Sequence, residues 1–348
     1  MNLLEVAKRA GVSTATVSRV MNDTGGVRES TRRRVLAVAK SLHYAPNAHA
    51  SALAKGTSKM LGVIVSNVEN PFFLDIFQAM ESAASAAGYS LVLENTGYHP
   101  QRLAGSLRTL LGLRPSGLAL VVSEMEVSVL DDLARRGTPA VVYDATHPAA
   151  NITSVRVRYE VGMRRAIEYL RSLGHRRMAF VGHHAGLVPL QERRRTFIET
   201  MQLYASDAEF TTAEQEDTPQ GGRQAVAQLL NSGFKPTAIL CVNDFMAIGA
   251  LRGLRERGLR VPQDVSVTGF DNIVLSEYTV PALTTLDIPR WRIGRICVEA
   301  LMRDPTQSRF TPETLIEPEL VLRGSTGMAP KDEAAASPTS NGKTRRPR

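Results

Sequence analysis

The stretch Leu3–Asn22, LLEVAKRAGVSTATVSRVMN, predicts two short helices joined by a tight turn. The small Ala7 lets the helices approach each other, Gly11 accepts the positive φ of a turn, and Val17 packs at the crossing. Ser13 follows the turn and can cap the second helix through its side-chain oxygen. This pattern is typical of a helix-turn-helix unit, whose second helix enters the DNA major groove. An ordinary hairpin of two helices is the alternative.

The chain has 348 residues and a formal net charge of +8, most of which lies near the N-terminus. Residues 1–59 hold ten Lys and Arg against three acidic residues, and the segment from 324 onward holds five against two. The part between them is slightly acidic. A basic N-terminal segment on a nearly neutral body indicates that this segment binds a polyphosphate such as DNA. A solvated basic surface without a partner is the alternative.

Cys241 and Cys297 are the only cysteines, so the sequence predicts neither a disulfide framework nor a zinc site. No apolar run is long enough to span a membrane, and the N-terminal helix is amphipathic, unlike a signal peptide. We therefore expect a cytoplasmic protein that needs no metal and no cofactor.

From residue 60 onward, apolar strands alternate with amphipathic helices. Strands are predicted at 60–66, 89–94, 116–122, 140–143, 152–157, 177–181, 238–242 and 265–269. Helices are predicted at 71–87, 101–111, 127–136, 159–173, 191–204, 220–231, 245–257 and 291–302, and the segments 284–288 and 315–322 complete the body. This alternation predicts an α/β fold with parallel sheets, and its length favours two lobes over one.

These patterns divide the chain into four parts. Residues 1–46 form a three-helix head, and 60–323 form the two-lobed core. Between them, residues 47–59 contain NAHASALA, a helix too short to be stable unless something packs on it. Residues 324–348 lack apolar periodicity and are predicted to be disordered.

Ligands of open α/β sheets bind beyond the carboxyl ends of the strands. The residues in such positions are 66–73, 123, 144, 157–158, 182–184, 243–244 and 271–272. In a two-lobed core, the ends of both sheets would face one cleft.

Several segments, in one order, resemble the lactose/galactose repressor family of bacterial transcription factors. They include EVAKRAGVSTATVSRVMN, LGVIVSNVENPFF, NDFMAIGA, VPQDVSVTGFDN and PALTTLDIPRWRIG, and the resemblance covers residues 2 to about 323. It implies a helix-turn-helix head, a hinge helix and a core like that of periplasmic binding proteins. It also implies a homodimeric repressor of a near-palindromic operator, with an affinity controlled by a small molecule bound between the lobes.

The resemblance assigns base reading to Thr14, Ala15 and Arg19, with Arg19 as the candidate for a bidentate contact to guanine. An ordinary surface charge is the alternative for Arg19. The expected phosphate contacts are Ser13, Thr16, Asn22 and Tyr44. Leu53 matches a hinge leucine that wedges into the minor groove, and a contact with the core is its alternative. Ser51 stands where the family often has arginine.

The resemblance also implies an effector site in the cleft. The expected contacts are Phe72, Phe73, Arg158, Arg193, Asn243 and Asp271. Arg193 would clamp the effector and Asp271 would accept its hydroxyl groups, although a structural salt bridge is the alternative for this pair. One of the two phenylalanines would equally suit the lobe core. Asp244 is expected to cap the following helix.

Val157-Arg158 stands where the family frequently has Asp-Asn. Together with Arg156 and Arg193, it predicts additional positive charge near the cleft. Since the arginine fork matches carboxylate or phosphate, the hypothesis is that the effector is a sugar acid or another small carboxylate rather than a neutral sugar. The alternative is that Arg156 and Arg158 face solvent.

Two other functions compete with a ligand-controlled repressor. A solute-binding protein would explain the core, but not the basic head. An enzyme is disfavoured because the chain contains no GxSxG motif, no P-loop and no GxGxxG motif after a strand.

Overall fold

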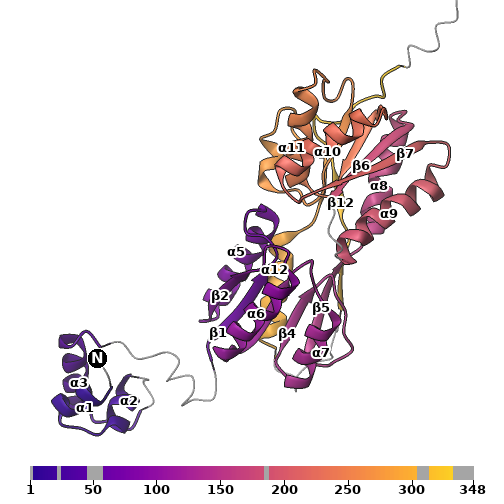
Figure 1. Cartoon of the computed structure of the whole chain (residues 1–348). Helices are drawn as coiled ribbons and strands as arrows, with labels where there is room; N and C mark the ends of the chain where they lie inside the picture. Colours follow the sequence, from indigo (N-terminus) through magenta and orange to yellow (C-terminus); the bar gives the residue numbers. More distant parts are fainter. Residues whose placement is uncertain (1–2, 22–24, 45–57, 184–187, 304–312, 332–348) are drawn as a thin grey trace, which may run out of the picture.

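The computed structural model describes residues 3–21, 25–44, 58–183, 188–303 and 313–331 (Figure 1). The N-terminal head consists of α1 (Leu3–Ala10), α2 (Thr14–Met21) and α3 (Glu29–Ser41). Val6, Val17 and Val35 are fully buried, so each helix contributes to one small core. Gly11 has a φ of +64°, and the N–H of Val12 donates to the carbonyl of Ala7 at 3.1 Å. The predicted helix-turn-helix is confirmed.

Lobe 1 is built on a six-stranded parallel sheet of order β11-β5-β4-β3-β1-β2. Its strands are β1 (Met60–Val65), β2 (Ser90–Asn95), β3 (Gly117–Val121), β4 (Ala140–Tyr143), β5 (Ile152–Val157) and β11 (Glu313–Ile316). Its helices are α5 (Pro71–Ala86), α6 (Pro100–Gly112), α7 (Val127–Arg136) and α12 (Arg290–Leu301). The central strands are apolar because both faces of the sheet are covered.

Lobe 2 is built on a four-stranded parallel sheet of order β7-β6-β8-β9. Its strands are β6 (Arg177–His183), β7 (Glu209–Gln215), β8 (Ala238–Cys241) and β9 (Ser266–Thr268). Its helices are α8 (Tyr159–Ser172), α9 (Val188–Tyr204), α10 (Pro219–Asn231), α11 (Asp244–Arg255) and the short 3-10 helix η1 (Val274–Glu277). An antiparallel pair, β10 (Thr285–Asp287) and β12 (Glu319–Val321), lies beside it.

In the described part of the core, the chain passes between the lobes after β5, after β10 and between β11 and β12. The second passage ends in α12, which returns to lobe 1 and packs on α5. This packing is close because Gly294 has no side chain. A Cβ there would lie 2.6 Å from the carbonyl oxygen of Ile76. Two segments far apart in the sequence are therefore held together in lobe 1.

Two sequence predictions about strands are corrected by the structure. β7 was not predicted, because its sequence EFTTAEQ is polar and only Ala213 is buried, as suits a strand at the sheet edge. The segment predicted as one element at 315–322 contains two strands, β11 and β12, which belong to different lobes.

The predicted disorder from residue 324 is wrong for residues 324–331. Ser325 is fully buried, its hydroxyl donates to the carbonyl of Val267 at 2.6 Å, and its carbonyl accepts from the N–H of the same residue at 2.8 Å. The N–H of Ala329 donates to the carbonyl of Leu173 at 2.8 Å. Backbone pairing of this kind requires no apolar period, so the sequence pattern gave no sign of it. Lobe 2 therefore extends beyond the predicted boundary at 323.

Candidate functional site

The outer face of α2 carries the predicted base-reading residues. Thr14, Ala15 and Arg19 are exposed, whereas Val17 and Val20 are buried against the other two helices. The side chains most suited to reach DNA therefore project from a helix whose orientation is fixed by packing.

The residues predicted to contact phosphates have different environments. The side-chain oxygen of Ser13 accepts from the N–H of Thr16 at 3.2 Å, so Ser13 caps α2 as expected. Tyr44 packs on the head core, and its N–H donates to the carbonyl of Ala39 at 2.9 Å. Asn22 and Leu53 lie outside the described residues.

Between the lobes lies a set of ionisable side chains that we call the interlobe cluster. Its members are Tyr98, Glu124, Tyr143, Asp144, Tyr159, Arg193, Asp217 and Asp271. Most of them lie at or just after the carboxyl ends of strands of the two sheets, where ligands of such sheets bind, and Arg193 lies on α9. A cavity of about 470 Å³ adjoins the cluster, lined by lobe 1 residues such as Asn67 and Tyr98 and by lobe 2 residues such as His183 and Asp217.

Arg193 of α9 is a buried member of the interlobe cluster, with 8% of its surface exposed. One terminal nitrogen donates to the Tyr159 hydroxyl at 2.7 Å and the other donates to the Val242 carbonyl at 3.3 Å. The guanidinium carbon lies 4.3 Å from the centre of the Tyr159 ring. The Nε of Arg193 is buried and has no hydrogen-bond partner in the described part of the chain.

Asp271 is 2% exposed, and its Oδ1 likewise has no hydrogen-bond partner among the described residues. Burial raises the pKa of Asp271 well above its usual value, and the charge of Arg193 partly opposes this effect. In the part of the structure described, no direct ion pair joins the side chains of Arg193 and Asp271. The alternative interpretation of this pair as a structural salt bridge is therefore wrong. Two buried polar atoms that lack partners in this region indicate a place for a ligand.

Asn243 and Asp217 form a bridge between the lobes with Tyr98. The Tyr98 hydroxyl, from lobe 1, donates to Asp217 Oδ2, and Asp217 Oδ1 accepts from Asn243 Nδ2 at 2.6 Å. Asn243 Oδ1 also accepts from the N–H of Met246 at 2.8 Å, so this side chain caps α11. The predicted effector contact of Asn243 competes with these two structural hydrogen bonds.

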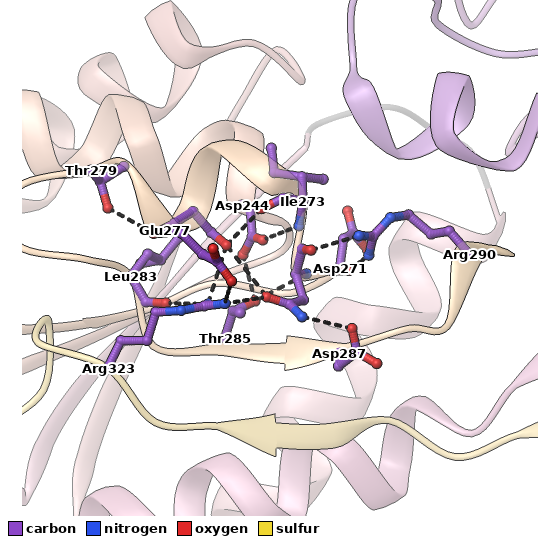
Figure 2. A network of polar contacts seen from close by, with 12 residues as sticks. Asp244, Asp271, Ile273, Glu277, Thr279, Leu283, Thr285, Asp287, Arg290 and Arg323 are labelled. Atoms are coloured by element: carbon purple, nitrogen blue, oxygen red, sulfur yellow. Dashed lines mark hydrogen bonds and ion pairs between the residues drawn. The ribbon is translucent and has the colours of Figure 1, made fainter. Parts of the chain in front are cut away.

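Asp244 does not cap α11, in contrast to the prediction. Its carboxylate accepts from the Thr285 hydroxyl at 2.5 Å and from the N–H of Ile273 at 2.9 Å (Figure 2). Burial raises the pKa of Asp244 to about 7, although both hydrogen bonds favour the charged form. Asp244 therefore holds the loop that carries Asp271.

Asp144 joins lobe 1 to α8 and, through it, to α9. Its carboxylate accepts from the Tyr159 hydroxyl and from the N–H of Val157, the latter at 2.9 Å. Burial raises the pKa of Asp144 to about 6. Tyr159 in turn accepts from Arg193, so a chain of hydrogen bonds runs from lobe 1 to α9.

Phe72 and Phe73 begin α5 and are both nearly buried. Their rings meet edge to face with centres 5.3 Å apart. Phe72 contacts Tyr143, and Phe73 contacts Tyr98, whose ring lies 5.3 Å from that of His183 in lobe 2. The phenylalanines thus form the lobe 1 wall behind the tyrosines of the interlobe cluster.

Arg158, predicted to contact the effector, has its side chain engaged at the surface. Its side chain is 42% exposed and pairs with Glu160 and Glu317, each at 2.8 Å. Arg156 pairs with Glu313 at 3.1 Å, on the strand beside its own. On β5, Val155 and Val157 on either side of Arg156 are buried, so Arg156 faces the surface. Arg158 follows the strand and binds acidic side chains at the surface. The additional positive charge on which the acidic effector depended does not reach the cleft.

Sequence reasoning missed three of the polar residues that hold the interlobe cluster together: Tyr98, Tyr159 and Asp217. Asp217 follows β7, and the position after a strand could have indicated it if that strand had been predicted. Tyr98 lies three residues beyond β2 with a φ of +63°, and nothing in the local sequence marks it. Asp144 was found because it directly follows β4.

Comparison with known proteins agrees with this architecture. Residues 2–47 match the family model "Bacterial regulatory proteins, lacI family", and residues 167–326 match the periplasmic binding protein-like domain. The chain is 34% identical to the transcriptional repressor PurR of Erwinia tasmaniensis, over 94% of this chain and 97% of that protein. It is 35% identical to PurR of Haemophilus influenzae, over 92% and 97%.

Solved structures show the same arrangement. A lac repressor dimer bound to operator and the anti-inducer ONPF is 30% identical, with a TM-score of 0.81 over 94% of this chain and 99% of that one. A LacI-family regulator from Silicibacter pomeroyi is 26% identical, with a TM-score of 0.82 over the same shares. Within the described residues, no helix is both long and apolar enough to cross a membrane. The chain belongs to the LacI family of bacterial regulatory proteins.

Proposed function

We propose that this protein is a cytoplasmic transcriptional repressor that binds a near-palindromic operator as a homodimer. Its affinity for the operator falls or rises when a small molecule binds between the lobes. The similar lac repressor was solved as a dimer with operator and a ligand. The observation that carries the proposal is a pair of buried atoms, Arg193 Nε and Asp271 Oδ1, that lack hydrogen-bond partners among the described residues of a chain with a helix-turn-helix head. A ligand between the lobes would satisfy both atoms.

On the DNA side, Thr14, Ala15 and Arg19 are proposed to read base edges, since all three project from the outer face of α2. Ser13, Thr16, Asn22 and Tyr44 are proposed to position the head on phosphates, and Leu53 to wedge into the minor groove. The capping bond of Ser13 uses its oxygen as an acceptor, which leaves its hydroxyl hydrogen for a phosphate or for Thr16.

The charges of the interlobe cluster favour a class of ligand different from the acidic effector expected from the sequence. The interlobe cluster contains the carboxyl groups of Glu124, Asp144, Asp217 and Asp271 and the guanidinium of Arg193. A second guanidinium beside Asp271, that of Arg290, is already paired with the carboxylate of Asp75. A buried anion would meet uncompensated repulsion there. We therefore propose an uncharged ligand that donates hydrogen bonds from hydroxyl or ring N–H groups, with Asp271 as an acceptor.

The homodimer has a candidate face in lobe 2. Four large apolar side chains, Val274, Leu275, Tyr278 and Val280, are between 44% and 89% exposed within seven residues. Exposed apolar segments of this kind mark protein–protein contacts. We propose a second copy as the occupant, because a near-palindromic operator requires two heads and the similar lac repressor is a dimer. Tyr278→Asp should convert the dimer to monomer in sedimentation velocity, and an unchanged dimer would exclude this face.

DNA binding is tested with the full-length protein and a fluorescent fragment of its own promoter region. We expect fluorescence anisotropy to show tight binding of the promoter fragment. At moderate salt, unlabelled random DNA of the same length should not displace this fragment. A folded dimer that binds neither fragment at low salt would instead favour a solute-binding protein.

The ligand class is tested by thermal shift with matched pairs: glucose and glucuronate, galactose and galacturonate, adenosine and adenosine monophosphate. We expect that only uncharged members of these pairs stabilise the core. The Asp271→Asn substitution should remove this stabilisation. Stabilisation by the acidic members alone would restore the carboxylate hypothesis.

A further inference from the structure

Arg290, the first residue of α12, connects the two lobes directly beside Asp271. Its side chain is 14% exposed, and its Nε donates to the carboxylate of Asp75 on α5 at 2.8 Å. Its terminal nitrogens donate to the carbonyls of Asp271 and of Asn272, the latter at 2.6 Å (Figure 2). One guanidinium therefore binds a carboxylate of lobe 1 and two backbone carbonyls of the loop that carries Asp271.

The loop held by Arg290 has an unusual backbone. Asp271 and Asn272 are consecutive residues with φ of +106° and +56°, a conformation that costs free energy for residues other than glycine. From lobe 2, the loop is held by Arg323, whose Nη2 donates to Asn272 Oδ1 at 2.7 Å, and by Asp244, which accepts from the next N–H. These contacts come from lobe 2 itself and move with the loop.

Arg290 and Asp75 are fixed to lobe 1. The helices α5 and α12 pack on each other, and the absence of a side chain at Gly294 permits their close approach. Asp75 lies on the turn of α5 that follows Phe72 and Phe73. A movement of lobe 2 relative to lobe 1 must therefore either carry the Asp271–Asn272 carbonyls away from the guanidinium or turn α12 with them.

We infer that Arg290 is a positioning residue: it locks the Asp271–Asn272 turn of lobe 2 to α5 of lobe 1, and so couples occupancy at Asp271 to the angle between the lobes. The coupling to ligand occupancy rests on the proposed function, because the angle between the lobes matters for regulation only if a ligand changes it. The lock itself requires neither ligand nor DNA. It differs from the Tyr98–Asp217 bridge because it acts on the backbone of the ligand-facing residue.

Geometry explains why arginine serves here. The planar guanidinium presents donors in several fixed directions, which fit one carboxylate and two carbonyls at once. A lysine at this position keeps the charge for Asp75 but has a single ammonium group, which is too compact to bind all three acceptors. A glutamine loses the charge and most of the donors.

The test measures lobe separation in the full-length protein. Spin labels are placed on exposed cysteines introduced at Ser128 of α7 and Lys235 beyond α10, and the labelled protein is diluted with unlabelled protein. Distances are measured by double electron–electron resonance in Arg290→Gln, Arg290→Lys, Asp75→Asn and the Asp75→Asn/Arg290→Gln double variant. Arg295→Gln is the matched control, because Arg295 lies on the same helix and pairs with Glu299 on the surface at 3.2 Å.

We expect a narrow distance distribution for the unsubstituted chain and for Arg295→Gln, and a distribution at least twice as broad for Arg290→Gln. Arg290→Lys should fall between them. Asp75→Asn should broaden the distance distribution as well. The distribution of the double variant should be no broader than that of Arg290→Gln alone, because the two residues act as one unit.

A second readout follows amide hydrogen exchange in peptides spanning residues 268–278. Asp75→Asn, a substitution on α5 of lobe 1, should accelerate exchange in this lobe 2 loop at least threefold, whereas a merely local role of Asp75 would change only α5. Distributions for Arg290→Gln that match those for Arg295→Gln would overturn the inference. Failure of DNA binding would remove the proposed function and leave this result standing.

Discussion

The head and the interlobe cluster use the same kinds of side chain in opposite ways. On α2, the predicted base-reading residues project outward from one continuous stretch of sequence, and the buried Val17 and Val20 pack the helix on the head core. In the interlobe cluster, several polar groups hold one another, as Tyr159 does between Asp144 and Arg193. A substitution on α2 should therefore change recognition with little effect on folding, whereas a substitution in the cluster should change both.

The largest effect is expected from Arg193→Met. Removal of the guanidinium leaves Tyr159 without its donor and the buried carboxyl groups without a compensating charge. We expect the free energy of unfolding of the core to fall by about 3 kcal/mol, measured by urea denaturation. Arg194→Met is the control, because Arg194 is 47% exposed and pairs with Glu214 at the surface. Equal losses for the two variants would mean that the cluster does not hold the lobes together.

The next effect concerns pH. Burial raises the pKa of Asp144 to about 6, above its value in the unfolded chain. The folded state therefore binds this proton more tightly, so the contribution of Asp144 to stability falls as pH rises from about 4 to 6 and stays low above pH 6. Asp144→Asn should flatten the stability profile of the core over this range by about 2 kcal/mol relative to the unsubstituted chain. Parallel profiles would show that Asp144 titrates normally.

A smaller effect is expected on the DNA side. If Arg19 reads a base, Arg19→Ala should weaken operator binding by about 1–2 kcal/mol, while binding to random DNA at low salt changes little. Arg33→Ala, which removes an exposed charge of α3 paired with Glu29, should weaken binding to both DNAs alike or to neither. Melting of the head should stay the same in both variants. Equal losses on operator and random DNA for Arg19→Ala would reduce Arg19 to a phosphate contact.

The smallest effect is expected from Arg158→Ala. Its ion pairs with Glu160 and Glu317 are exposed, and such pairs contribute little. The free energy of unfolding should change by less than about 0.5 kcal/mol, and the thermal shifts caused by uncharged ligands should be unaffected. Loss of these thermal shifts would indicate that Arg158 contacts the ligand, and would contradict the difference between surface and buried arginines.

The site was predictable to the extent that local position implied it. Arg193 and Asp271 came from the family resemblance, and Asp271 also lies three residues beyond β9 of lobe 2. The resemblance also suggested Asn243, whose side chain the structure uses as a helix cap and a bridge to Asp217. Arg158 failed because the residue after a strand need not face the cleft when acidic neighbours on the surface bind it.

By itself, the sequence determined the helix-turn-helix head, the alternation of strands and helices, and the two-lobed α/β core. These features depend on local periodicity, capping and turn residues, which are readable along the chain. Only the tertiary structure decided which charges lie in the cleft, that β7 brings Asp217 to Tyr98, and that Arg290 binds Asp75 and the loop of Asp271 at once. These contacts join residues up to 215 positions apart. Their existence depends on how crossing strands and close-packed helices bring distant segments together, which no local pattern encodes.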